Sequence, residues 1–81
     1  MTFELYQEVA LAQDLPAEGL RRSDVATVVE RLPAIDGQEG YVLEVFNALG
    51  ETMKVVVVPA TAISSITADE ILSVRSLAPR V

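Results

Sequence analysis

Glycine and proline interrupt this chain of 81 residues so often that most of it is left in segments of strand length. The interruptions fall at Pro16, Gly19, Pro33, Gly37, Gly40, Gly50 and Pro59. Between them, the stretches richest in the residue types that strands prefer are residues 8–12, 24–31, 41–47 and 52–58. Four short strands with short connections indicate an all-β domain, and no repeat or linker divides residues 1–81 into more than one unit.

The last two of these segments predict a hairpin with a definite register. A three-residue loop, residues 48–50, puts Asn47 opposite Glu51 and places Gly50 at the left-handed position that such a loop requires. One face then carries three apolar cross-strand pairs, which are Val45 with Met53, Leu43 with Val55 and Tyr41 with Val57. The other face carries an opposite-charge pair and an apolar pair, Glu44 with Lys54 and Val42 with Val56. We therefore expect Leu43 and Val55 to be buried.

The remaining segments are less regular. The apolar residues of 24–31 do not alternate strictly, which is typical of a strand that is covered on both faces or bends at Ala26. After Pro59 we expect one 3₁₀ turn and a short strand over residues 63–66. Thr67-Ala68-Asp69-Glu70 has the form of a capping box. It opens either a helix of about ten residues that ends before Pro79, or one turn followed by a strand over 72–77, so residues 67–81 pack on the barrel as helix or strand.

The composition excludes several kinds of chemistry. The chain has no His, no Cys and no Trp, which removes zinc sites, nucleophiles that depend on Cys or His, His-ligated haem and thiol redox chemistry. The carboxylate pairs that remain, Glu4 with Glu8 and Asp69 with Glu70, have no sequence reason to be desolvated. We therefore expect no catalytic residue, no cofactor site, no metal site and no enzymatic activity.

The charge is negative and unevenly spread. All 12 acidic residues lie within residues 1–70 and give that part a net charge of −8, whereas residues 71–81 have a net charge of +2. An acidic domain repels phosphate backbones, so we expect no nucleic-acid partner. The basic pair Arg21 and Arg22 is expected to pair with Asp14, Glu18 or Asp24 around it in the sequence.

Two further features bear on location. The start of the chain has no basic region of the kind found in signal peptides. No apolar run approaches the roughly 20 residues that cross a bilayer. We therefore expect a soluble, cytoplasmic protein without a membrane partner.

The runs YQEVALAQDLPAEGLRRSDVATVVE and YVLEVFNALGETMKVVVVPA resemble a family of small bacterial domains of unknown function. Its members show a VAL, then a DLP, then a GDVGTVVE-like strand and an acidic YEVEF strand. The resemblance covers about residues 5–66, with Ser23 and Ala26 where glycine is usual. It implies no catalytic residues, and it implies genomic company with other small proteins, some suspected to form toxin–antitoxin or immunity pairs.

The same pattern looks like the wider group of SH3-like barrels. In those, a long loop after the first strand, here residues 12–23, leads to a second strand, a hairpin, a 3₁₀ turn and a last strand. We therefore predict a small SH3-like barrel of about five strands, with one 3₁₀ turn or short helix near the C-terminus.

One face of the predicted hairpin has no evident internal cover. Its apolar residues are Val42, Phe46, Val56 and Val58, interrupted by Glu44 and Lys54. Apolar clusters exposed on small domains often mark interfaces. The alternative is that the C-terminal segment folds back over this face with Ile71, Leu72, Val74 and Leu77.

The function predicted from these features is protein binding without catalysis. The six residues of the hairpin face would form the contact, and the surrounding acids would steer a basic protein towards it, as in an antitoxin or immunity protein. Two alternatives stay open: an accessory subunit of an enzyme complex, and a homodimeric structural protein that pairs through the same face.

Overall fold

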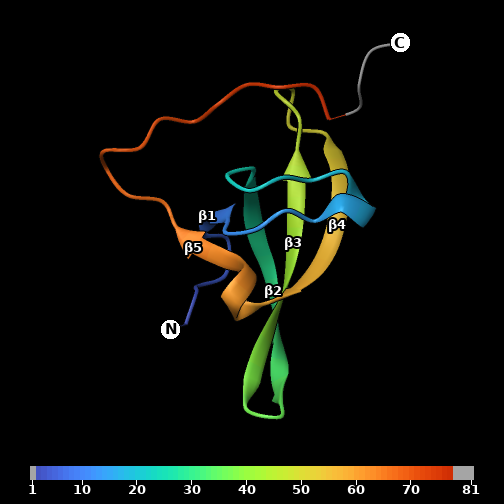
Figure 1. Ribbon diagram of the computed structural model, residues 1–81, viewed down its shortest axis with the longest axis vertical. Helices are drawn as coiled ribbons and strands as arrows, with labels where there is room; N and C mark the ends of the chain where they lie inside the picture. Colours follow the sequence, from blue (N-terminus) through green and yellow to red (C-terminus); the bar gives the residue numbers. More distant parts are fainter. Residues whose placement is uncertain (1, 78–81) are drawn as a thin grey trace.

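The computed structural model describes residues 2–77 and shows five antiparallel strands in one sheet (Figure 1). The strands are β1 (Glu8–Leu11), β2 (Val25–Ile35), β3 (Gln38–Phe46), β4 (Thr52–Pro59) and β5 (Ile63–Ser65). Two 3₁₀ turns, η1 (Pro16–Glu18) and η2 (Ala60–Ala62), lie in the long loop after β1 and directly before β5. The strand order β4-β3-β2-β1-β5 is that of an SH3-like barrel, so the predicted all-β fold is confirmed.

Strand β2 is long because it belongs to both sides of the barrel. Its first residues pair with β1 and its remainder pairs with β3, with a shift of register between Val28 and Glu30. An extra residue of this kind bends a strand and increases its twist, which explains the imperfect alternation of apolar residues. Beyond the barrel, β2 and β3 continue as a two-stranded ribbon (Figure 1). Asp36 and Gly37 close this ribbon, both with positive φ as a type I′ turn requires.

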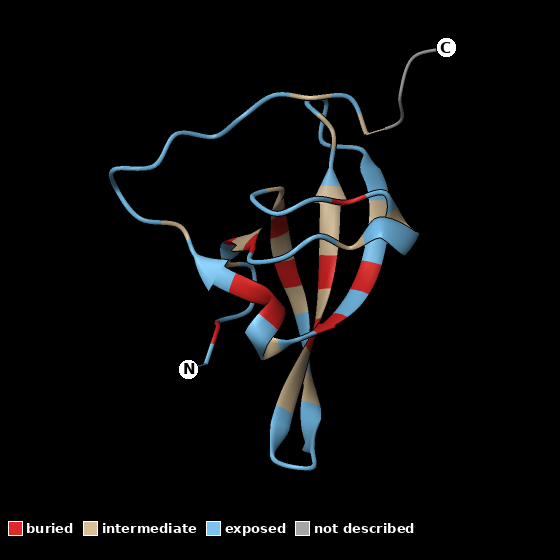
Figure 2. Cartoon of the chain, in the orientation of Figure 1, coloured by how far each residue is buried: buried red, intermediate tan, exposed pale blue. Residues whose placement is uncertain are grey.

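The core lies between the bent sheet and the segments that close its ends (Figure 2). Each strand contributes apolar side chains to it, and Leu20 from the long loop and Ala62 from η2 are buried with them. The buried apolar residues of the strands are Val9, Leu11, Ala26, Val28, Tyr41, Leu43, Val56, Val58 and Ile63. Burial of apolar surface on this scale is the main stabilising contribution in a domain of this size.

The pairing of β3 with β4 differs from the prediction by one residue. At the loop the prediction is correct, because the N–H of Asn47 donates to the carbonyl oxygen of Glu51 at 2.9 Å and Gly50 has a φ of 81°. Phe46 then pairs with Thr52, but Val45 pairs with Lys54. Met53 is therefore an extra residue on β4, a β-bulge that reverses which side chains of the strand point inwards.

The bulge exchanges the two faces of β4. Leu43 lies opposite Val56 and is buried as predicted, whereas Val55 is 58% exposed and its predicted burial was wrong. Residues 55–58 are all valine, so both faces of the strand are equally apolar and the sequence pattern cannot choose between the two registers.

The chain after β5 has no regular secondary structure over residues 66–77. The N–H of Glu70 donates to the carbonyl oxygen of Thr67 at 3.1 Å, and the N–H of Thr67 donates to Oε1 of Glu70 at 2.7 Å. The capping box thus forms a single turn, and neither the predicted helix nor the predicted strand over 72–77 follows it. The segment then crosses one end of the barrel (Figure 1). Pro79 and the rest of the predicted 67–81 segment beyond residue 77 lie outside the described residues.

Within residues 2–77, no helix is long and apolar enough to cross a membrane.

Candidate functional site

The structure separates the six residues predicted to form one binding face. Val56 and Val58 belong to the core and are not available to a partner. Lys54 lies on the same side of β4 as these valines, and its Nζ is 3.8 Å from Oε2 of Glu18 in η1. The predicted pair of Glu44 with Lys54 was therefore wrong. Its physical cause is the bulge at Met53, which turns these side chains of β4 to the inner face.

The other three predicted residues remain accessible to different degrees. Val42 and Glu44 lie on the outer face of β3 and are half-buried, whereas Phe46 is exposed at the end of the strand. Glu44 accepts a hydrogen bond from the hydroxyl of Thr52. Thus the structure brings only Val42 and Glu44 together on one surface.

The bulge creates a different apolar surface on the outside of the hairpin. Val42 lies opposite Val57, and Glu44 lies opposite Val55. The two β4 valines are 58% and 65% exposed, which is high for apolar strand residues. We call Val42, Val55 and Val57 the outer patch. The outer patch spans β3 and β4, and β4 is the last strand of the sheet order, with β3 as its one neighbouring strand in the described structure.

A groove lies at the loop end of the β3–β4 hairpin. It has a volume of about 420 Å³ and separates this end of the hairpin from the C-terminal segment. The barrel side of this hairpin groove is mainly apolar and includes Leu20, Val25, Val45, Phe46 and Met53. The polar residues that line the groove are Asp24, Asn47, Ser73 and Arg75.

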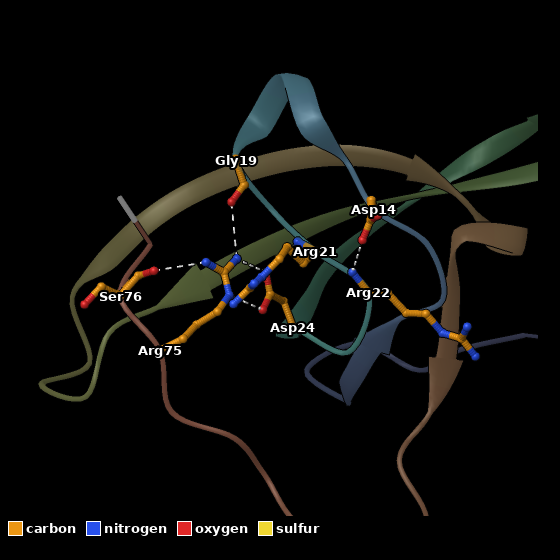
Figure 3. Close-up of polar contacts among 7 residues, drawn as sticks. All are labelled: Asp14, Gly19, Arg21, Arg22, Asp24, Arg75 and Ser76. Atoms are coloured by element: carbon orange, nitrogen blue, oxygen red, sulfur yellow. Dashed lines mark hydrogen bonds and ion pairs between the residues drawn. The ribbon is translucent and has the colours of Figure 1, made fainter. Parts of the chain in front are cut away.

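Arg75 fixes the C-terminal segment to the long loop (Figure 3). Its Nε donates to Oδ1 of Asp24 at 2.8 Å, and its Nη2 donates both to Oδ2 of Asp24 and to the carbonyl oxygen of Gly19, the latter at 3.2 Å. The hydrogen bonds from Arg75 hold the pKa of the Asp24 carboxyl below its ordinary value, and the backbone N–H of Arg21 adds to this effect. A two-point contact between guanidinium and carboxylate is the strong form of an ion pair.

The basic pair of the long loop does not behave as predicted. The backbone N–H of Arg21 donates to Asp24 at 2.7 Å, and the backbone N–H of Arg22 donates to Asp14 at 2.9 Å (Figure 3). These acids therefore shape the loop through its amides. In the described part of the chain, the ion pairs of Asp24 and Glu18 are made with Arg75 and Lys54 instead.

Sequence reasoning missed the pair of Asp24 and Arg75 because the two residues are 51 positions apart. The available signal was the charge distribution, with basic residues and no acid in residues 71–81 beside an acidic body. That distribution indicates attraction between the two parts but does not select the residues.

The predicted carboxylate pairs have ordinary surroundings. Glu4, Glu8, Asp69 and Glu70 are all exposed. The hydroxyl of Thr67 donates to Asp69 and lowers the pKa of that carboxyl, which is opposite to the shift that a general acid needs. Among the residues that the structure describes, no group of three or more acids is placed to hold a metal ion.

The topology and the absence of α-helices from the described chain define a small all-β domain of SH3-like form. The sequence matches the family described as "Domain of unknown function (DUF4926)" over residues 5–65, and the chain belongs to this family. Comparisons with curated proteins and with solved structures give no match. The matched range ends with β5, so Arg75 lies outside it.

Proposed function

We propose that this domain is a non-catalytic protein-binding module whose partner is a basic protein, and that it binds through the outer patch. The observation that carries the proposal is the exposure of Val55 and Val57 side by side with Val42, with no described segment covering them. Exposed apolar surface of this kind on a small domain is typical of an interface.

The charge of the domain supports a basic partner. The whole chain has a net charge of −6, and the outer patch lies beside Glu44 and, one strand further, Glu30 opposite Val42. Acidic side chains around an apolar centre accelerate encounter with a positively charged surface. In its specific form, the proposal is an antitoxin or immunity protein that meets a nucleic-acid-directed partner in the cytoplasm.

The test is co-expression of the tagged chain with the product of the adjacent open reading frame. We expect the two to co-purify, and we expect the double variant Val55→Asp and Val57→Asp to lose the partner without unfolding, because both residues are exposed. The double variant Ala34→Asp and Ile35→Asp, at two exposed sites on the β2–β3 ribbon, introduces the same two charges elsewhere and serves as the matched control. No binding by the unmodified chain, or equal binding by the double variant, would contradict the proposal.

A second candidate is a homodimer formed through the same patch. It is favoured by the position of β4 at the end of the sheet order, because an edge strand offers backbone groups that can pair with a strand of a second copy. Sedimentation equilibrium of the purified chain separates the two candidates. A dimer that the double variant converts to a monomer supports the second one, whereas a monomer at all concentrations supports the first.

A further inference from the structure

The geometry points to the hairpin groove as a second contact site, which receives an extended segment of the basic partner that carries an arginine. In the isolated domain, residues 72–77 form one wall of this groove and the side chain of Arg75 binds Asp24 and Gly19, and the segment moves away when the partner binds. This inference rests on the proposed function and adds the chemistry by which the partner is recognised.

The carboxylate of Asp24 and the carbonyl oxygen of Gly19 form a guanidinium slot, and the contacts that hold these two groups in place do not involve Arg75. The backbone N–H of Arg21 orients the carboxylate of Asp24, and the N–H of Leu11 fixes the carbonyl oxygen of Asp24 at 2.9 Å. Gly19 has a φ of 72° and its carbonyl oxygen is the third acceptor of the slot. Three acceptors held in this way present a preorganised site for a guanidinium group.

Residues 71–77 make few contacts with the barrel. Ile71 and Val74 are 95% and 99% exposed, so they add almost no apolar contact. In the described structure, no backbone–backbone hydrogen bond joins residues 71–77 to the barrel. The segment is attached by the side chain of Arg75 and by the packing of Leu77 against the core. A segment with so few contacts is readily displaced.

The C-terminal segment does not fill the groove. About 420 Å³ remains beside Phe46 and Met53, both of which are exposed. An occupant with larger apolar side chains next to its arginine would cover this surface as well as fill the slot. The acidic net charge makes a basic peptide segment the complementary occupant.

The experiment uses the full chain with Arg75→Ala, which empties the slot, and a synthetic peptide of the sequence ILSVRSL, taken from residues 71–77. The peptide is titrated into ¹⁵N-labelled protein, and the amide signals of Leu20, Arg21 and Asp24 are followed. We expect the dissociation constant of the peptide to be at least about tenfold lower for the variant than for the unmodified chain. In the unmodified chain Arg75 is tethered beside the slot and competes with the peptide at an effective concentration in the millimolar range.

Two controls make the result specific. The peptide ILSVASL lacks the arginine and is expected to cause no shift of the same amide signals. Because the two peptides are compared on the same protein, a difference between them cannot result from a change in the folding of the domain. Equal binding of the two peptides, or no binding of either to the variant, would overturn the inference. So would a dimer of the unmodified chain that Arg75→Ala abolishes, because the occupant would then be the segment of a second copy.

The outer patch separates this inference from the proposed function. The double variant Val55→Asp and Val57→Asp is expected to bind the peptide as before, because neither residue lines the groove. Co-purification of the partner without any peptide binding would overturn the groove site and leave the proposed function intact. Peptide binding without co-purification would overturn the proposed function alone.

Discussion

The hydroxyl of Tyr41 accepts a hydrogen bond from the backbone N–H of Phe3 at 3.1 Å, and the two rings meet edge to face with their centroids 5.4 Å apart. The same hydroxyl donates to Oε2 of Glu39 at 2.6 Å. Tyr41 is fully buried, and its hydroxyl both accepts and donates a hydrogen bond, as a buried polar group requires. One side chain thereby joins the N-terminal segment to the centre of β3.

Removal of that hydroxyl should destabilise the domain. Tyr41→Phe keeps the ring but leaves the N–H of Phe3 without its acceptor, and a buried unsatisfied amide costs about 1–3 kcal/mol. Urea unfolding at neutral pH measures the change. Tyr6→Phe removes a hydroxyl from a residue that is 74% exposed and should leave the free energy of unfolding unchanged. Equal stability of Tyr41→Phe and the unmodified chain would contradict the role assigned to this hydrogen bond.

The same tyrosine predicts a loss of stability in alkaline solution. Burial, with a further contribution from Glu39, raises the pKa of Tyr41 above its ordinary value of 10.0. Above that ordinary value the unfolded chain releases the phenol proton before the folded chain does, so unfolding becomes more favourable as the pH rises towards the folded-state pKa. The stability difference between the unmodified chain and Tyr41→Phe should therefore narrow above pH 10. A constant difference between pH 8 and pH 11 would show that Tyr41 does not titrate as a buried group.

The fold followed from the sequence because the local signals agreed with one another. The loop at Gly50 and the apolar stretches each placed a strand close to where the structure has it, whereas two of the expected breaks, Pro33 and Gly40, lie inside β2 and β3. The likeness to SH3-like barrels supplied the order of the elements, and the long loop and the turn η2 lie where that order requires.

The candidate site did not follow, for two physical reasons. Alternation assigns a face only where polar and apolar residues alternate, and residues 55–58 offer the same side chain on both faces. A single extra residue, Met53, therefore decided which valines were exposed. The contact of Arg75 with Asp24 depends on the path of an irregular segment, which no periodic pattern encodes.

The bulge at Met53 predicts opposite outcomes for neighbouring valines. Val56→Asp places a charge without a partner in the core and should reduce stability by about 3 kcal/mol or more, a large share of the free energy of unfolding of a domain of this size. Val55→Asp adds the same charge at an exposed position opposite Glu44 and should reduce stability by no more than about 1 kcal/mol. Melting temperatures of both variants, measured by circular dichroism, show which of the two valines is buried. A larger loss of stability in Val55→Asp than in Val56→Asp would contradict the bulge and support the register predicted from the sequence.

The pair of Asp24 and Arg75 predicts how the domain responds to acid. Because Arg75 lowers the pKa of Asp24 from its ordinary value of 3.8, the pair stabilises the folded state above that value. The contribution is lost as the pH falls towards the folded-state pKa, since the unfolded chain takes up the proton first. Arg75→Ala should therefore lower the free energy of unfolding at pH 7, and its stability should approach that of the unmodified chain as the pH falls below 3.8. Arg22→Ala, in the long loop, removes the same single positive charge but no hydrogen bond to Asp24, because the described hydrogen bond of Arg22 is made by its backbone N–H to Asp14. If Arg22→Ala and Arg75→Ala had the same pH profile, the effect would be one of net charge and not of the pair.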